Sequence, residues 1–162
     1  MLSRGLRDLR ARLTPTRHGS LVAAGIGDVR IVAPDVEQSS MGHAITHSRP
    51  ITARRTPIGA FDAWRVNGTP ADCVLMAVRK VMPERPDLVL SGVNSGQNMA
   101  DDVTYSGTVA GAMEGTLLGI RSIAISQAYN VKGAARLVSW ETVETLAPEL
   151  LERILKIVLQ RF

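Results

Sequence analysis

Apolar runs and helical patterns alternate along most of this chain. Runs rich in Val, Ile, Leu and Ala predict strands at 29–33, 61–66, 87–93 and 122–126. Apolar positions recur at helical spacing over 69–81, 108–118 and 140–162. Strands that alternate with helices are joined by right-handed crossovers and form a doubly wound, mostly parallel sheet. We therefore predict the α/β fold class, with helices on both faces of the sheet.

Individual residues refine these helices. Thr69, Pro70 and Asp72 suit the start of the first helix, as N-cap, first residue and early acid. In the second helix, glycines at a spacing of four predict a bare face that lies close on the sheet: Gly107, Gly111, Gly115 and Gly119. The last helix is predicted to be amphipathic, with an apolar set of Val143, Leu146, Leu150, Ile154 and Ile157. Pro148 predicts a kink or a restart within it.

The segment 86–119 reads as a strand, a polar loop and a helix that opens on Ser106, Gly107 and Thr108. This order favours an anion site, because the first N–H groups of a helix point outward and its dipole attracts negative charge. The loop also carries oxygen ligands suited to Mg²⁺ or Mn²⁺, namely Asn94, Asn98, Asp101 and Asp102. A well-capped turn with no ligand explains the same local pattern equally well.

Three loops follow predicted strands, at 34–40, 67–69 and 94–108. In doubly wound sheets the site lies beyond the carboxyl ends of the strands. We therefore expect polar residues of these loops to converge.

The sequence lacks the motifs of several well-known nucleotide, zinc and serine-nucleophile sites. The chain has no GxxxxGK[ST] and no GxGxxG directly between a strand and a helix, which argues against those nucleotide sites. His43 and His47 have no third zinc ligand nearby in the sequence. No GxSxG elbow marks a serine nucleophile.

Composition narrows the class of protein. The 162 residues suit one α/β domain, and 45% hydrophobic residues can bury a core. Cys73 is the only cysteine, which fits a reducing compartment and excludes an intrachain disulfide. No apolar run approaches the roughly 18 residues of a membrane span, so we expect a cytoplasmic protein with no membrane partner. The net charge of +4 comes from an arginine cluster within the first 17 residues, so we predict no nucleic acid polymer as a partner.

That cluster sets residues 1–28 apart from 29–162. Leucines recur there at helical spacing between the arginines: Leu2, Leu6, Leu9 and Leu13. An organellar transit peptide and a surface helix are two explanations. We favour a third, a frameshifted or wrongly assigned gene start, for the reason given below. The domain division that we predict is an atypical Arg-rich segment 1–28 followed by an α/β domain 29–162.

Four motifs carry a family resemblance: APDVEQSS at 33–40, GTPADC at 68–73, SGVNSGQN at 91–98 and DDVTYSGTVAGAMEG at 101–115. In order and spacing they resemble SurE, the survival-protein family of metal-dependent 5′-nucleotidases that also act as acid phosphatases. The resemblance runs from about residue 29 to 140. It implies a Rossmann-like α/β domain that hydrolyses nucleoside 5′- or 3′-monophosphates with a divalent metal, Mg²⁺ or Mn²⁺.

The resemblance also implies roles for particular residues. Ser39 and Asn94 match family metal ligands. The region that holds the phosphate corresponds to Asn98, Ser106, Gly107 and Thr108. The family's acidic ligands belong to an Asn-Asp-Asp-Gly motif at the end of a first strand, and this sequence has no such motif. No catalytic residue is therefore assigned.

The missing motif leads us to expect weak metal binding, little turnover and open edges on the sheet strands beside the lost strand. Open edges of this kind invite aggregation. For this reason we favour a frameshifted or wrongly assigned gene start over a redesigned protein. By comparison with the family, residues 29–162 look like a partial SurE-like phosphatase/nucleotidase domain. The chain looks truncated at both ends and lacks the segment that family homo-oligomers exchange between subunits. The alternative to an enzyme is a non-catalytic phosphate-binding remnant or pseudoenzyme.

Overall fold

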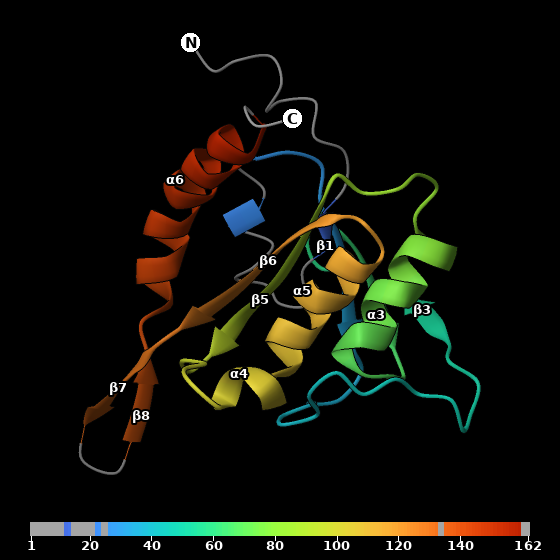
Figure 1. Cartoon of the computed structure of the whole chain (residues 1–162), viewed down its shortest axis with the longest axis horizontal. Coiled ribbons are helices and arrows are strands. Elements are labelled where there is room, and N and C mark those ends of the chain that lie inside the picture. Colours follow the sequence, from blue (N-terminus) through green and yellow to red (C-terminus); the bar gives the residue numbers. More distant parts are fainter. Residues whose placement is uncertain (1–11, 14–21, 24–25, 133–134, 160–162) are drawn as a thin grey trace.

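A computed structural model describes residues 12–13, 22–23, 26–132 and 135–159 (Figure 1). The strands are β1 (Arg12–Leu13), β2 (Arg30–Pro34), β3 (Ala53–Arg55), β4 (Asp62–Val66), β5 (Leu88–Ser95), β6 (Arg121–Gln127), β7 (Tyr129–Lys132) and β8 (Ala135–Val138). The helices are α3 (Pro70–Met76), its π-helical continuation η1 (Ala77–Val81), α4 (Asp102–Tyr105), α5 (Gly107–Leu117) and α6 (Trp140–Leu159). The four predicted strands and three predicted helices are all present within a few residues of their expected bounds.

Six strands form one sheet in the order β3-β4-β2-β1-β5-β6. Every neighbouring pair is parallel except β3 with β4. The strands β7 and β8 form a separate antiparallel hairpin, which the sequence analysis did not predict. The α/β fold class with a mostly parallel sheet is confirmed.

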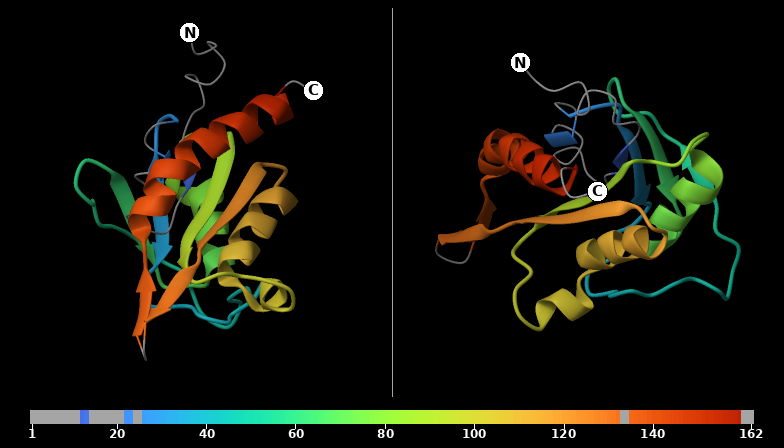
Figure 2. Two further views of the ribbon diagram at one scale, coloured as in Figure 1. Left: turned by 90° about the vertical axis from the view of Figure 1, so that its left-hand side faces the viewer. Right: turned by 45° about the horizontal axis from the view of Figure 1, so that its top comes forward.

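Helices cover both faces of the sheet (Figure 2). Alternate residues of one strand point to opposite faces, and β5 shows this in its core contacts. Leu88 and Leu90 belong to the cluster that contains α6, whereas Val89 belongs to the cluster that contains Cys73 and Val74 of α3. The prediction of helices on both faces is confirmed.

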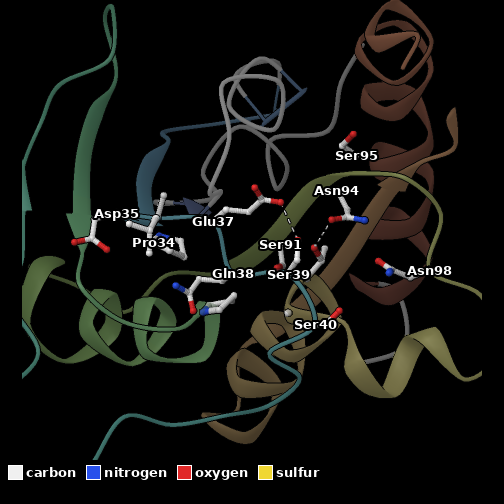
Figure 3. Close-up of a pocket in the computed structure, with 15 residues that line it drawn as sticks. Pro34, Asp35, Glu37, Gln38, Ser39, Ser40, Ser91, Asn94, Ser95 and Asn98 are labelled. Atoms are coloured by element: carbon white, nitrogen blue, oxygen red, sulfur yellow. Dashed lines mark hydrogen bonds between the residues drawn. The ribbon is translucent and has the colours of Figure 1, made fainter. Parts of the chain in front are cut away.

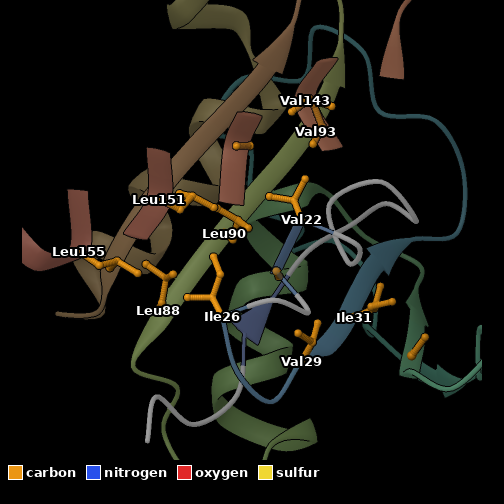
Figure 4. Close-up of a cluster of buried hydrophobic side chains, with 13 residues drawn as sticks. Val22, Ile26, Val29, Ile31, Leu88, Leu90, Val93, Val143, Leu151 and Leu155 are labelled. Carbon is orange, nitrogen blue, oxygen red and sulfur yellow. The ribbon is translucent and has the colours of Figure 1, made fainter. Parts of the chain in front are cut away.

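The face of α6 that packs on the sheet differs from the predicted set (Figure 4). Its buried residues are Val143, Ala147, Leu151 and Leu155. Of the predicted residues, Leu146, Leu150 and Ile157 are exposed by 60%, 56% and 57%. The prediction was wrong for these three because the helix carries two apolar stripes and only one of them meets the strands. The helix is also continuous through Pro148, so no restart occurs there.

The predicted bare face of α5 against the sheet is confirmed at two of its four glycines. A Cβ on Gly111 would lie 2.7 Å from Ser91 Oγ, and one on Gly115 would lie 2.9 Å from Val89 Cγ2. Gly107 instead lies close to α3, where a Cβ would be 2.9 Å from Pro70 Cγ, so it does not face the sheet. Gly119 differs, because it follows the end of the helix with a φ of 73° and allows the chain to turn toward β6.

Among the described residues, the expected open edges in the middle of the sheet are closed only over the two residues of β1, so the expectation was wrong at that end alone. β1 lies between β2 and β5: Leu13 pairs with Arg30 and with Val89, and Arg12 pairs with Leu88. Leu13 is thus part of a strand, whereas the rest of the predicted leucine pattern, at 2, 6 and 9, lies outside the described residues.

Part of the segment 1–28 belongs to the core. Val22 and Ala23 are fully buried and Ile26 is 5% exposed, in the same cluster as α6. The division at residue 28 stays a prediction. No helix in the described ranges is long and apolar enough to cross a membrane.

Candidate functional site

A cavity of about 540 Å³ lies beyond the carboxyl ends of β2 and β5 (Figure 3). It is lined by residues 33–40, the end of β5, Asn98 and the first turn of α5, with Pro70 of α3. The two strands are parallel, so their carboxyl ends meet at one edge of the sheet. Two of the three predicted loops therefore converge here. The loop at 67–69 instead braces a neighbouring segment, because Asn67 Oδ1 accepts a hydrogen bond from Thr52 N at 2.7 Å.

Ser39 lines this cavity from the loop after β2. Its Oγ donates a hydrogen bond to Glu37 Oε1 at 2.9 Å (Figure 3). Both residues are exposed to solvent at the cavity mouth. The predicted metal ligand is therefore accessible and sits beside a carboxylate.

Asn94 lines the cavity from the end of β5, and its amide is oriented by two contacts. Its Nδ2 donates to Gly96 O at 2.9 Å, and its Oδ1 lies 3.4 Å from Thr108 Oγ1, which donates to it. The pairing of β5 with β6 shifts register between Ser91 and Asn94. Gly92, with a φ of 125°, lies within this shift, in a backbone conformation that side chains disfavour. The strand thus deviates just before Asn94, whose side-chain oxygen faces the start of α5.

Asn98 is held by two hydroxyl groups. Its Oδ1 accepts from Ser106 Oγ at 3.0 Å and from Ser126 Oγ at 2.9 Å. The Nδ2 group remains as a donor, which suits an anionic ligand. The sequence analysis missed Ser126. The sequence does offer a reason to consider it. Ser126 is a hydroxyl residue at the carboxyl end of the predicted strand 122–126, and that strand end lies at the same edge of the sheet.

The first turn of α5 forms the adjoining wall. Gly107 and Thr108 line the cavity, whereas the buried Ser106 does not. Ser106 Oγ accepts from Val109 N at 3.2 Å and so caps the helix. Its predicted phosphate-binding role would therefore act through Asn98. The cavity receives the positive end of the helix dipole.

Several residues that the sequence analysis considered as metal ligands lie outside the cavity lining. Asp101 and Asp102 are exposed at the start of α4 and do not line the cavity. His47 is exposed, and His43 pairs with Glu114. Among the described residues, no group of three or more His, Cys, Asp or Glu side chains could hold a metal ion.

The segment from Ser39 to Thr46 follows the cavity loop, and Asp72 holds it at Thr46. This fully buried carboxylate accepts from Thr69 N at 2.9 Å and from Thr46 N at 3.1 Å. Burial alone would raise the pKa of Asp72, but the hydrogen bonds from Thr46 and Thr69 outweigh burial and lower it. Asp72 N also donates to Thr69 Oγ1, which completes the predicted cap. The cap of α3 thus also anchors the cavity loop.

Two acids of the cavity were not predicted as site residues. Asp35 and Glu37 line it from the loop after β2. Their signal in the sequence is their place directly after an apolar strand, in a loop already expected at the site. In the described part of the chain, they are the only ionisable side chains that line the cavity.

The sequence model described as Survival protein SurE matches residues 3–161 of the chain. The chain belongs to the SurE family. It is 58% identical over 129 residues to a protein of Brucella canis named 5′-nucleotidase SurE, an alignment that covers 80% of this chain and 49% of that protein. The Brucella anthropi protein of the same name is 57% identical over 129 residues, again 80% of this chain and 49% of that protein. The chain thus spans about half the length of the curated SurE relatives it matches.

A solved structure agrees with this membership. The SurE protein from Aquifex aeolicus superposes with a TM-score of 0.75 and 34% sequence identity. The match covers 91% of this chain and 60% of that one. The SurE fold predicted from the motifs is confirmed.

Proposed function

We propose that this chain is a divalent-metal-dependent phosphomonoesterase that hydrolyses nucleoside 5′- or 3′-monophosphates to nucleoside and phosphate. The observation that carries the proposal is one cavity that joins Ser39 and Asn94 to Asn98 and Thr108. The relatives named 5′-nucleotidase SurE support the choice of substrate class.

The chemistry of the lining suits a hard cation. The hydroxyl of Ser39, the amide oxygen of Asn94 and the carboxylates of the loop after β2 are all oxygen donors, which Mg²⁺ and Mn²⁺ prefer. A cation bound there would polarise the phosphoryl oxygens and lower the pKa of a water molecule. Ser39 would hold it from the loop after β2, and Asn94 from the end of β5.

The start of α5 suits the phosphate. Asn98 presents an Nδ2 donor whose orientation is fixed through its Oδ1 by two hydroxyl groups. Gly107 and Thr108 add first-turn N–H groups, which bind anions without a positively charged side chain. These residues would orient the phosphoryl group toward the oxygen ligands across the cavity.

A second candidate is a phosphate-binding protein without catalysis. It is favoured by the neutral character of Ser39 and Asn94 and by the absence of an Asn-Asp-Asp-Gly motif from the sequence. Neutral oxygens can complete a coordination shell, but they offset little of the cost of dehydrating Mg²⁺.

Hydrolysis of 5′-AMP by the purified chain, with and without Mn²⁺, separates the two candidates. We expect Mn²⁺-dependent release of phosphate that Asn94→Ala abolishes. Asn130→Ala is the matched control, because Asn130 is an exposed residue of the β7–β8 hairpin and does not line the cavity. Absence of hydrolysis in all three proteins would favour the non-catalytic candidate.

A further inference from the structure

The cavity described above carries negative charge that none of its other described lining residues balances. Among the described residues that line it, Asp35 and Glu37 are the only ionisable groups. Within the described part of the chain, neither carboxylate forms an ion pair. A phosphomonoester carries about −1.5 to −2 charges at neutral pH. Such a ligand would be repelled by the two carboxylates unless a cation lay between them.

The distance between the side-chain oxygens of Glu37 and Ser39 matches the distance between two neighbouring ligand oxygens around a small divalent cation. Glu37 Oε1 and Ser39 Oγ are 2.9 Å apart. Two oxygens bound at right angles to an ion at about 2.0–2.1 Å lie roughly 2.9 Å from each other. The pair can therefore occupy neighbouring positions around Mg²⁺ or Mn²⁺ with little movement, and the hydroxyl proton can remain on the side of the carboxylate.

Ser91 independently indicates a polar ligand in the same cavity. It lines the cavity from β5 and is only 6% exposed. No hydrogen bond of its hydroxyl group is present within the described ranges. Buried hydroxyl groups almost always have a partner. A hydrated cation or a phosphoryl oxygen in the cavity would provide one.

We propose that Glu37 is a carboxylate ligand of the divalent cation in this cavity, beside Ser39 and together with Asn94. The inference rests on the proposed metal dependence, and it supplies the acidic ligand that the motif comparison did not find. Asp35 adds a second negative charge to the same loop without a contact to Ser39. Because the carboxylates repel the phosphate, the cation binds first and the phosphate binds to the loaded site.

Calorimetric titration of the purified chain with MnCl₂, in the absence of nucleotide, tests the assignment. We expect Glu37→Gln to weaken Mn²⁺ binding by about tenfold or more, because the variant keeps the side-chain shape and loses the charge. Glu37→Asp, which keeps the charge on a shorter side chain, should lose less. Glu149→Gln is the matched control, because Glu149 is exposed on α6 and does not line the cavity. This substitution should leave the Mn²⁺ affinity unchanged.

The outcomes separate this inference from the proposed function. Equal Mn²⁺ affinity in the parent chain and Glu37→Gln would overturn the assignment even if 5′-AMP is hydrolysed. Absence of Mn²⁺ binding to the parent chain would overturn it as well. Loss of binding in Glu37→Gln without any hydrolysis by the parent chain would support Glu37 as a ligand and contradict the phosphomonoesterase. Equal thermal unfolding of the variants ensures that the affinities refer to folded protein.

Discussion

His43 Nε2 lies 2.8 Å from Glu114 Oε2, although the two residues are 71 positions apart in the chain. Their side chains are exposed by 28% and 10%. His43 follows the cavity loop, and Glu114 lies on α5, whose first turn forms another cavity wall. Gly42 N donates to Tyr105 O at 2.9 Å beside this pair. The contact therefore fixes the distance between the loop that carries Ser39 and the helix that carries Thr108.

His43→Ala is expected to lower the free energy of unfolding by about 1–3 kcal/mol, because it leaves a buried carboxylate without its partner. It should also raise the KM for 5′-AMP, since the two cavity walls lose a connection. Urea unfolding and steady-state kinetics measure the two effects. His47→Ala is the control, because His47 is exposed and a change there should cost less than about 0.5 kcal/mol. Similar losses in both variants would show that the contact with Glu114 has no special effect.

The stabilising effect of Asp72 should depend on pH. Its pKa is lowered in the folded chain, where hydrogen bonds from Thr46 and Thr69 outweigh the opposing effect of burial. The unfolded value is about 3.9, so this stabilisation is present above that pH and is lost as the pH falls through the lower folded value. Asp72→Asn should therefore cost about 1–3 kcal/mol at pH 7 and less in acid.

Urea unfolding of the parent chain and Asp72→Asn between neutral and strongly acidic pH measures this difference. Asp101→Asn provides the control, because Asp101 is exposed and its side chain makes no cap hydrogen bond. A cost for Asp72→Asn that stays constant down to low pH would contradict the assignment of the effect to the ionised carboxylate.

Gly115→Ala is expected to destabilise the chain although alanine is the better helix former. The gain in helix propensity is about 1 kcal/mol. The added Cβ would lie 2.9 Å from Cγ2 of Val89, a β-branched residue that is 1% exposed, and also too close to Ser122 Oγ. Overpacking of this kind costs about 1–3 kcal/mol, so the net change should be a loss of stability. Thermal unfolding measures it beside Thr116→Ala, an exposed neighbour for which no loss is expected; a stabilised Gly115→Ala would contradict the close packing.

The strands and helices were predictable where one physical signal dominated. β5 is nearly continuous in apolar residues, and α3 begins with a complete cap. The buried face of α6 was not predictable in this way, because Leu146 and Leu150 form an apolar stripe of their own and only the position of the sheet selects Ala147 and Leu151. β1 was missed because two residues carry no periodicity, and its place between β2 and β5 depends on pairing with both.

The candidate site follows the same division. The anion loop could be predicted because the strand, the polar loop and the helix N-terminus are contiguous in sequence, and Asn98 with the first turn of α5 do lie together. Asp101 and Asp102 were wrong as cavity residues, since the short helix α4 directs this part of the chain away from the lining. Ser126 and Glu37 lie at or after the carboxyl ends of predicted strands, but only the parallel order of β2, β5 and β6 shows that they come together at one site.

Asn98→Asp should separate the fold of the site from its affinity for phosphate. The aspartate keeps an oxygen that can accept from Ser106 and Ser126, as Asn98 Oδ1 does at 3.0 and 2.9 Å, so thermal unfolding should change little. It removes the Nδ2 donor and adds a negative charge where the phosphate is proposed to bind. Loss of one hydrogen bond to a charged group costs about 1.5–3 kcal/mol, so the KM for 5′-AMP should rise by about 10- to 150-fold. Asn130→Asp adds the same charge on the exposed β7–β8 hairpin and should leave the KM unchanged. An unaltered KM in Asn98→Asp would place the phosphate elsewhere in the cavity.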